Sequence, residues 1–342
     1  MKKVSVVILN WNGEKLLPEF LPSVLKHTDL EYAEIVVADN NSGDNSIACL
    51  KENFPQIRLI QLAENYGFAE GYNQALQHIE SDYVVLLNSD VEVTENWLMP
   101  AIGFMDANET VAALQPKILS YRNKEYFEYA GASGGFIDKY GYPFCRGRIF
   151  GNIEKDHAQY DDITDIFWAS GACMFIRLND FIQAGGFDST FFAHMEEIDL
   201  CWRLNARGRK IVCYPHSVVY HVGAATLSAE NPRKTFLNFR NNLLMLYKNL
   251  PEKSLKKTLT VRLFLDYIAA FQMIVSGKYK NAKAVLQAHK DFKNIRNSYK
   301  SKREINIQKT NTETIKTLYN KSILWNFYAK QKKTFDKLGI KL

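Results

Sequence analysis

The sequence has little of what several classes of protein need. Among 342 residues there are only five cysteines, an odd number, and none shows a CxxC spacing. No run of 18 or more apolar residues is free of charges, no GxGxxG turn follows the first apolar run, and no Walker GxxxxGK[ST] motif occurs. These absences argue against a disulfide scaffold, a spanning helix, a nicotinamide enzyme and a P-loop protein. We expect reduced, mostly buried thiols and a cytoplasmic location.

Charge is divided unevenly along the chain. Hydrophobic residues make up 46% and charged residues 23%, the composition of a protein that buries a core. Residues 232–342 hold 25 Lys and Arg against 6 Asp and Glu, whereas residues 1–231 hold 18 basic and 31 acidic residues. The net charge of +6 therefore conceals two parts of opposite sign. This split predicts two functional regions, the second of which faces a polyanion or an anionic membrane.

The first hundred residues alternate strand-length apolar runs with helix-like stretches. The expected strands are Val4–Leu9, Ile35–Ala38, Arg58–Leu62 and Tyr83–Leu87, and the expected helices are Leu16–Lys26, Ser46–Asn53 and Ala69–Ile79. Such alternation predicts a mostly parallel sheet covered by helices on both faces. In sheets of this kind the ligand site lies outside the carboxyl ends of the strands. After about residue 100 the pattern is less regular, with short strands expected at Lys210–Tyr214 and Ser217–His221.

Polar residues follow each of the four strands. The segments are Asn10-Trp11-Asn12-Gly13, Asp39-Asn40-Asn41-Ser42-Gly43-Asp44, the stretch from Glu64 to Asn73, and Asn88-Ser89-Asp90. Any one of them is explained by an ordinary turn, because Asn, Asp and Gly are turn residues. Four such segments at one edge of a sheet favour a binding cleft instead.

Asp90 and His221 each end an apolar strand. A carboxylate in the position of Asp90 suits a divalent cation that also binds a substrate diphosphate, and it equally suits a cap on the next turn. A single histidine such as His221 is commonly a structural residue, but beside a cation site its neutral ring nitrogen is a good ligand. The sequence leaves both alternatives open.

A helix is expected from about Met195 to Ala206, and its first turn is acidic. The spacing places Glu197 over an apolar helix face, where it would point inward as a general base kept ionised by the helix dipole. A helix-capping glutamate explains the same residue equally well. Asp199 lies four residues before Arg203, a spacing typical of a surface ion pair.

Together these segments resemble the inverting nucleotide-sugar glycosyltransferases of family two, which have the GT-A fold. The match is closest to the rhamnosyltransferase-like subgroup, whose members extend bacterial surface polysaccharides. The matching stretches are Ser5–Gly13, Val36–Ser46, Glu64–Leu76, Asp82–Val93, Ala169–Asp188 and Phe191–Gly223. The resemblance implies an α/β protein with a mixed, mostly parallel sheet flanked by helices. It also implies a catalytic domain at 1–231, with a donor half at about 1–100 and an acceptor half at about 101–231. A basic helical extension at 232–342 would follow.

The resemblance also implies roles for individual residues. Donor-binding roles fall on Asn10, Asn12, Asp39, Asn65, Gly67, Gly71, Asn73, Asn88, Ser89 and Asp90. Asp90 and His221 would hold Mg²⁺ or Mn²⁺. The family's E-D-x-D segment aligns with Glu196-Glu197-Ile198-Asp199, so Glu197 is the expected base, one methylene longer than the usual aspartate. Glu196 and Asp199 are its alternates.

The basic extension is expected to be helical. Helices are expected at Phe236–Lys248, Ser254–Val275, Ala282–Ser298 and about Thr312–Leu338. Arg262 and Asp266 interrupt the most apolar stretch, which favours lying on a bilayer over crossing it. We expect peripheral attachment to the inner face of the plasma membrane, with a solvated appendage or an oligomer contact as alternatives.

These expectations combine into one function. The chain is expected to move a sugar from a dTDP- or UDP-sugar to a hydroxyl of a glycan or lipid-linked acceptor, with inversion, because a single carboxylate base permits one displacement. A sugar nucleotidyltransferase is a competing hypothesis, although Asn10–Lys15 lacks the glycine- and arginine-rich loop of that class. A non-enzymatic polyanion-binding protein is the other. No nucleic-acid partner is expected, since the basic region contains no recognisable nucleic-acid module.

Overall fold

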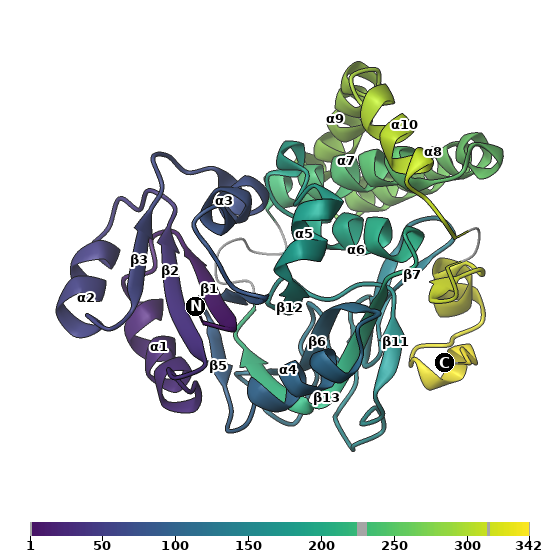
Figure 1. Cartoon of the computed structure of the whole chain (residues 1–342). Coiled ribbons are helices and arrows are strands. Elements are labelled where there is room, and N and C mark those ends of the chain that lie inside the picture. Colours follow the sequence, from purple (N-terminus) through teal and green to yellow (C-terminus); the bar gives the residue numbers. More distant parts are fainter. Residues whose placement is uncertain (1, 224–230, 313–314, 342) are drawn as a thin grey trace.

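The computed structural model describes residues 2–223, 231–312 and 315–341 (Figure 1). Within these residues nine strands form the main sheet, in the order β11-β13-β6-β12-β4-β1-β2-β3, with β5 paired to β13. Helices cover both faces of the sheet, and a further group of helices stacks beside α5 and α6 (Figure 1).

The first half of the sheet is parallel, as the alternation of runs predicts. Its strands are β1 (Val4–Asn10), β2 (Ala33–Asp39), β3 (Arg58–Gln61) and β4 (Tyr83–Asn88), connected by α1 (Leu16–His27), α2 (Ser46–Asn53) and α3 (Gly67–Leu76). Successive residues of β1 enter different cores, since Val7 packs on one face of the sheet and Val6 and Ile8 on the other. The register sets Asn10 opposite Asp39, so the polar strand ends meet at one edge.

The second half makes the sheet mixed. It contains β5 (Val91–Val93), α4 (Met99–Ala107), β6 (Val111–Ser120), β11 (Thr164–Ile166), β12 (Cys173–Arg177), α5 (Leu178–Ala184), α6 (Glu196–Ala206) and β13 (Lys210–His221). Strand β12 runs antiparallel to both β4 and β6. The two strands expected at 210–214 and 217–221 are one strand, because β13 continues along β6 through a register shift between Tyr214 and Val218.

A small second sheet joins the middle of the chain to its end. It consists of β7 (Gly135–Asp138), β8 (Pro143–Cys145), β9 (Arg148–Ile149), β10 (Asn152–Ile153) and β14 (Leu318–Tyr319). β14 pairs in parallel with β7, although residues 139–317 separate the two strands in sequence. The C-terminal segment is thus built into the fold.

The C-terminal helices are α7 (Pro232–Asn249), α8 (Glu252–Val275), α9 (Tyr279–Ile295) and α10 (Lys300–Gln308). Three expected helices are confirmed, with ends shifted by a few residues. The helix expected over about Thr312–Leu338 is wrong for the described residues there, which form β14 and two short turns, Trp325–Ala329 and Asp336–Leu338; residues 313–314 lie outside the description. Tertiary contacts override helix propensity here, because the Asp138 carboxylate accepts the Ile323 amide at 2.9 Å and Phe335 packs on Phe136.

The cysteines agree with the sequence-based expectation, whereas one helix differs from it. All five cysteines are free, and four of them are buried. Among the described helices, α8 alone is long and apolar enough to cross a membrane by length and composition, a finding that the charges within it did not lead us to expect.

Candidate active site

The loops after β1 and β2 are bound to each other at the polar edge. Asn10 donates from Nδ2 to Asp39 Oδ1 at 2.9 Å, and Asp39 in turn accepts the Ser42 hydroxyl at 2.6 Å. Asn12 adopts a left-handed conformation (φ 54°), and its Oδ1 accepts the Gly43 amide at 2.8 Å. Beside these loops lies a hollow of about 580 Å³, lined by Asn12, Glu14, Lys15, Leu16, Gly43 and Asp44. The buried Asn10 Oδ1 has no partner, which leaves an acceptor at this edge.

The loop before α3 is shaped by its glycine and asparagine residues. Asn65 Oδ1 accepts the Gly67 amide at 2.9 Å, and Gly67 has φ +73°. A Cβ on Gly67 would lie 2.5 Å from the Phe192 ring, so only glycine fits there. The amides of Phe68 and Ala69 both donate to the Phe192 carbonyl, at 2.7 and 3.1 Å. This loop therefore holds the segment that leads into α6.

The later residues of the same motif also make packing contacts. Asn73 exchanges two hydrogen bonds of 2.9 Å with the backbone of Phe187. A Cβ on Gly71 would lie 2.9 Å from Leu9, so glycine allows α3 to approach β1 closely. These two positions fix α3 against β1 on one side and the segment around Phe187 on the other.

Asp90 and His221 lie side by side, both buried. His221 Nε2 is 3.1 Å from Asp90 Oδ1 and 3.3 Å from Asn88 Nδ2, and Ser89, between these two residues in sequence, is half-buried. On its other side, His221 Nδ1 is 3.3 Å from Glu128 Oε2. The imidazole thus stands between two carboxylates.

The two carboxylates control the charge of His221. Burial by itself lowers the pKa of this imidazole, but the contacts with Asp90 and Glu128 outweigh burial and raise the pKa to about 10. Without a cation, His221 therefore carries the positive charge that offsets Asp90 and Glu128. A cation bound to Asp90 would take over that charge and leave Nε2 neutral for coordination.

The start of α6 presents unpaired polar atoms. His194 Nε2, Glu196 Oε2 and Glu197 Oε2 are all enclosed and have no hydrogen-bond partner. Phe192, His194 and Met195, just before the helix, have φ between 63° and 74°, a region that non-glycine residues rarely adopt. Strained backbone and unpaired buried polar atoms at one place are typical of sites that bind a ligand.

The two glutamates are both harder to ionise than usual. Burial raises the pKa of Glu197 to about 7. Burial and the neighbouring Glu197 charge raise the pKa of Glu196 well above the ordinary carboxyl value. As whole residues, Glu196 is 4% exposed and Glu197 is half-buried, but a carboxylate oxygen of each is enclosed. The buried oxygen of Glu197 agrees with the inward orientation expected for it, and Glu196 is enclosed as well.

One short segment joins the Asp90 and Glu197 regions. The Asn88 amide donates to the Ala172 carbonyl at 3.0 Å, at the end of β4. The Ala169 amide donates to Cys201 Sγ at 3.5 Å, one helical turn after Glu197. Residues 169–172 therefore contact Asn88, two residues before Asp90, and Cys201, four residues after Glu197.

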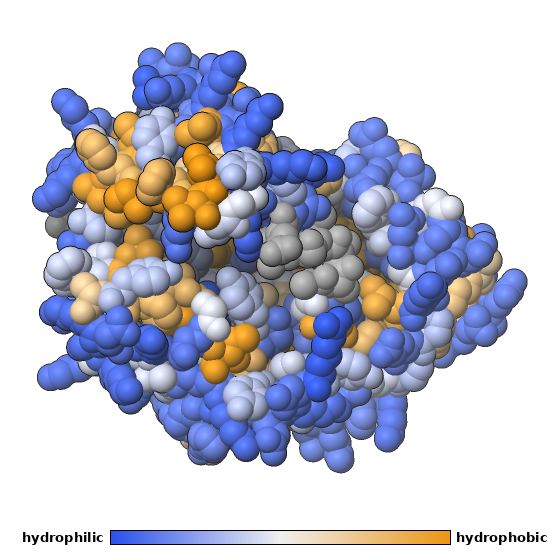
Figure 2. All heavy atoms as spheres, turned by 180° about the vertical axis from the view of Figure 1, so that it is seen from behind, coloured by the Kyte–Doolittle hydropathy of each residue, from blue (hydrophilic) through white to orange (hydrophobic). Residues whose placement is uncertain are grey.

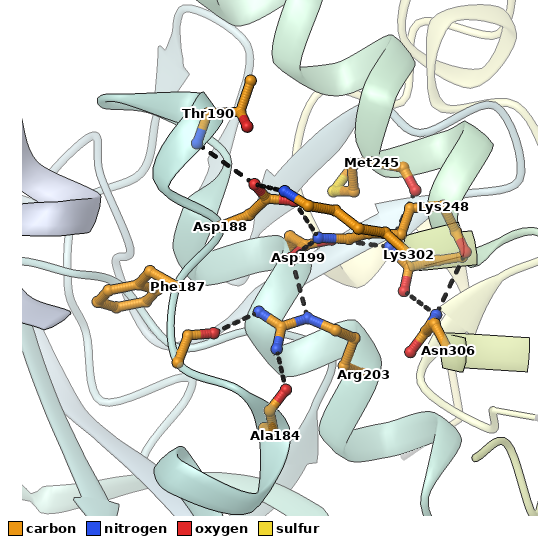
Figure 3. A network of polar contacts seen from close by, with 12 residues as sticks. Ala184, Phe187, Asp188, Thr190, Asp199, Arg203, Met245, Lys248, Lys302 and Asn306 are labelled. Atoms are coloured by element: carbon orange, nitrogen blue, oxygen red, sulfur yellow. Dashed lines mark hydrogen bonds and ion pairs between the residues drawn. The ribbon is translucent and has the colours of Figure 1, made fainter. Parts of the chain in front are cut away.

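Asp199 belongs to a buried ionic network (Figure 3). Its Oδ2 is 3.0 Å from Arg203 Nε and 2.7 Å from Lys248 Nζ, and its side chain is fully buried. Lys248 also reaches Asp188 Oδ2 at 2.8 Å. The expected pair with Arg203 is confirmed, but it is buried instead of lying on the surface. Because Asp199 pairs with the side chains of both Arg203 and Lys248, it is poorly placed to act as the base.

The residues around Asp90 suit a divalent cation. Mg²⁺ and Mn²⁺ are held by one or two carboxylates with further oxygens from a substrate phosphate, and an imidazole nitrogen is a good additional ligand. No group of three or more His, Cys, Asp or Glu in the described ranges forms a metal cage by itself. Asp90 and His221 match a site completed by the substrate.

The aromatic residues near the site belong mainly to the core. Trp168, Phe191 and Trp202 are almost fully buried, and Trp168 Nε1 donates to the Phe136 carbonyl at 2.9 Å. Phe192 is half-buried beside the start of α6.

Sequence reasoning missed two important residues. Glu128 lies in a loop after β6. The sequence around it contains no motif from which its contact with His221 could have been predicted. Lys248 lies among many lysines of the basic region, and only the structure shows that it is 5% exposed between two aspartates.

The sequence is similar to those of known glycosyltransferases. Residues 5–174 match the family model for glycosyl transferase family 2. RfbC of Myxococcus xanthus, an O-antigen biosynthesis protein, is 26% identical over 67% of this chain, and the match spans 18% of RfbC. The rhamnosyltransferase WbbL of Escherichia coli is 24% identical over 64% of this chain and 83% of WbbL. The N-acetylglucosaminyl-diphospho-decaprenol L-rhamnosyltransferase of Mycobacterium tuberculosis is 25% identical over 63% of this chain and 75% of its own length.

The fold is similar to those of solved GT-A enzymes. GalNAc-T7 with UDP, GalNAc and Mn²⁺ superposes with a TM-score of 0.58 at 17% identity, over 72% of this chain and 48% of that one. The mannosyltransferase PcManGT of Pyrobaculum calidifontis with GDP-Man and Mn²⁺ gives 0.52 at 15% identity, over 90% and 84%. These likenesses confirm the predicted fold class.

Proposed function

Because this chain belongs to glycosyltransferase family 2, we propose that it transfers a sugar from a dTDP- or UDP-sugar to an acceptor hydroxyl with inversion. The observation that supports this most is the 3.1 Å contact between Asp90 and His221 after the polar strand ends, together with the unpaired buried oxygen of Glu197. The family match favours sugar transfer over the nucleotidyl transfer and polyanion binding considered from sequence.

The donor lies at the polar edge of the sheet in this proposal. The β1 and β2 loops, with Asn10, Asn12 and Asp39, would enclose the nucleoside next to the 580 Å³ hollow. Asn65, Gly67, Gly71 and Asn73 would act indirectly, since their contacts shape α3 and the loop before α6. Asn88, Ser89 and Asp90 would face the diphosphate.

Asp90 and His221 would hold a Mg²⁺ or Mn²⁺ ion. The cation would offset the negative charge that develops on the departing nucleoside diphosphate. Several solved proteins of this fold contain Mn²⁺, which supports the assignment. Asp90 would orient the diphosphate, and Glu128 would hold the far side of the His221 ring.

Glu197 is proposed as the general base. Its unpaired oxygen would accept the proton of the acceptor hydroxyl, whose oxygen then attacks the anomeric carbon from the face opposite the leaving group. A single displacement inverts the configuration at that carbon. Glu196 is less suited, because it is buried and ionises with more difficulty.

The acceptor is proposed to be a growing surface glycan on a lipid carrier. The relatives that match are an O-antigen biosynthesis protein and rhamnosyltransferases, one of them named for a diphospho-decaprenol acceptor. Transfer to such a carrier would take place at the cytoplasmic face of the plasma membrane, where nucleotide sugars are available.

The donor and metal assignments predict a pattern of thermal stabilisation. UDP and dTDP, each with Mn²⁺, are expected to raise the melting temperature more than either diphosphate without metal, because binding to the native state alone stabilises it. Asp90→Ala is expected to lose the metal-dependent part of the shift. A thermal-shift panel of nucleoside diphosphates measures this.

Glu92→Ala is a matched control for that panel, because Glu92 lies two residues from Asp90 but pairs with Lys124 on the surface. It should retain the full Mn²⁺-dependent shift. An Asp90→Ala protein that still responds to Mn²⁺ would move the metal site elsewhere.

The raised pKa of Glu197 predicts a pH dependence. A base must be deprotonated, so kcat should be highest above the pKa of about 7 and fall as the pH decreases through that value. Burial and the charge of Glu197 also raise the pKa of the neighbouring Glu196 carboxyl. The measurement is kcat at saturating donor and acceptor between about pH 5.5 and 8.5. A kcat that is constant across this range would argue against Glu197.

A further inference from the structure

Helix α8 buries its charges and exposes its apolar side chains. Arg262 and Asp266 are 2% and 0% exposed, and Arg262 Nε is 3.1 Å from Asp266 Oδ1. Asp266 also accepts Tyr142 OH at 3.1 Å and contacts His289 Nε2 at 2.9 Å. The polar side of this helix is therefore its packed side, the reverse of an ordinary surface helix.

The outward side of α8 forms an apolar stripe, which we define as Phe264, Ile268, Phe271 and Val275. The spacings of four, three and four residues place these side chains on one face of the helix. They are 63–73% exposed, and Tyr267 and Ile274 widen the surface at 44% and 43%. Figure 2 shows hydrophobic residues gathered in a patch over the helical region, at the upper left. Contiguous exposed apolar surface of this kind marks an interaction site.

Positive charge surrounds the apolar stripe. Residues 253–290 contain eight Lys and Arg and one acidic residue, Asp266, which is buried. The exposed lysines are Lys253, Lys256 and Lys257 before the stripe in sequence and Lys278, Lys280, Lys283 and Lys290 after it. An apolar face with a lysine rim is the pattern of helices that lie in the interface of an anionic bilayer.

We propose that α8 docks this protein on an anionic phospholipid bilayer, with the helix axis in the plane of the membrane and the apolar stripe inserted among the acyl chains. A spanning orientation would separate Arg262 and Asp266 from Tyr142 and His289, so the helix lies on the membrane although it is long enough to cross it. A second copy of this chain fits less well, because two lysine rims would face each other.

The docking does not rest on the proposed transfer reaction, since no residue of the stripe belongs to the candidate active site. The two can therefore fail separately. If both hold, α8 would bring the active site to the surface that carries the acceptor.

Vesicle flotation of the full-length protein tests the proposal. We expect it to float with vesicles of phosphatidylglycerol and phosphatidylcholine, to bind phosphatidylcholine vesicles at least about tenfold more weakly, and to be released by salt. Phe264→Ser/Phe271→Ser should bind the anionic vesicles at least about tenfold more weakly than the wild type, since two large apolar groups no longer insert.

Ile182→Ser is the matched control, because Ile182 is 62% exposed on α5, away from the stripe. It should float like the wild type. Both variants should keep the wild-type melting temperature and the wild-type response to UDP with Mn²⁺, which separates loss of docking from loss of folding or of donor binding.

Three results would overturn the proposal. The wild type would stay unbound with anionic vesicles, or the double variant would float as well as the wild type. Alternatively, light scattering would show a wild-type dimer that the double variant converts to a monomer, without vesicle binding by either, and the stripe would then be an interface between copies.

Discussion

Glu197→Gln is expected to reduce kcat by about 10²–10⁴-fold, the usual contribution of a general base. The substitution keeps the size of the side chain but removes its ability to accept the acceptor's proton. Donor binding should be unchanged, because Glu197 lies on α6 and not on the strand ends that would hold the diphosphate. Steady-state kinetics with the sugar donor, together with UDP titration by calorimetry, separate the two effects.

Glu196→Gln is the matched control for Glu197→Gln. It changes the adjacent carboxyl of the same helical turn, which is 4% exposed and already favours its protonated form. Its kcat should stay within a few-fold of the wild type. If Glu196→Gln is the inactive variant and Glu197→Gln is active, the two roles are exchanged.

Lys248→Met is expected to lower the free energy of unfolding by about 3–5 kcal/mol, as for other buried charge pairs that lose one partner. The ammonium group lies between Asp188 and Asp199 at 2.8 and 2.7 Å, and all three side chains are at most 5% exposed. Methionine fills the space but leaves two carboxylates with less compensation. Urea unfolding followed by circular dichroism measures the loss.

Lys302→Met is the control, because Lys302 also pairs with Asp188 at 2.8 Å but is 46% exposed. Water replaces an exposed partner, so the loss should be about 0–1 kcal/mol. Equal losses for the two variants would show that burial of Lys248 is unimportant.

The stability that this network contributes is expected to depend on pH. Burial would raise the pKa of Asp188, but Lys248 and Lys302 outweigh burial and hold it well below the ordinary carboxyl value. A depressed pKa gives stability that is present above the ordinary carboxyl range and lost as the pH falls below it. The difference between the wild type and Lys248→Met should therefore shrink in strong acid.

The parallel half of the fold was predictable because its signals are local. Each strand is a short apolar run, and each ends in residues that form turns, so β1 to β4 follow the expected bounds closely. The segment after residue 312 was not predictable, because its structure depends on distant partners. Asp138 binds the Ile323 amide and β14 pairs with β7, and neither contact has a signature in the local sequence.

The candidate site was predictable in its residue types but less so in its geometry. Strand ends identify Asp90 and His221, and the structure brings the two side chains to 3.1 Å. Sequence spacing placed Glu197 on the inward face of the helix but did not indicate that Glu196 is enclosed beside it, which the structure shows. Glu128 was missed since its role comes from a loop that approaches His221 only in the folded chain.

The ionic network of Figure 3 also determines how the chain can be divided in the laboratory. Net charge changes sign near residue 231, which invites a truncation there, yet Asp188 and Asp199 lie before that point and Lys248 after it. A fragment that ends near residue 231 would contain the buried carboxylates of Asp188 and Asp199 but would lack Lys248, which pairs with both. The acidic and basic parts therefore share a buried ionic network, and shortened forms of the protein should retain α7 to α10.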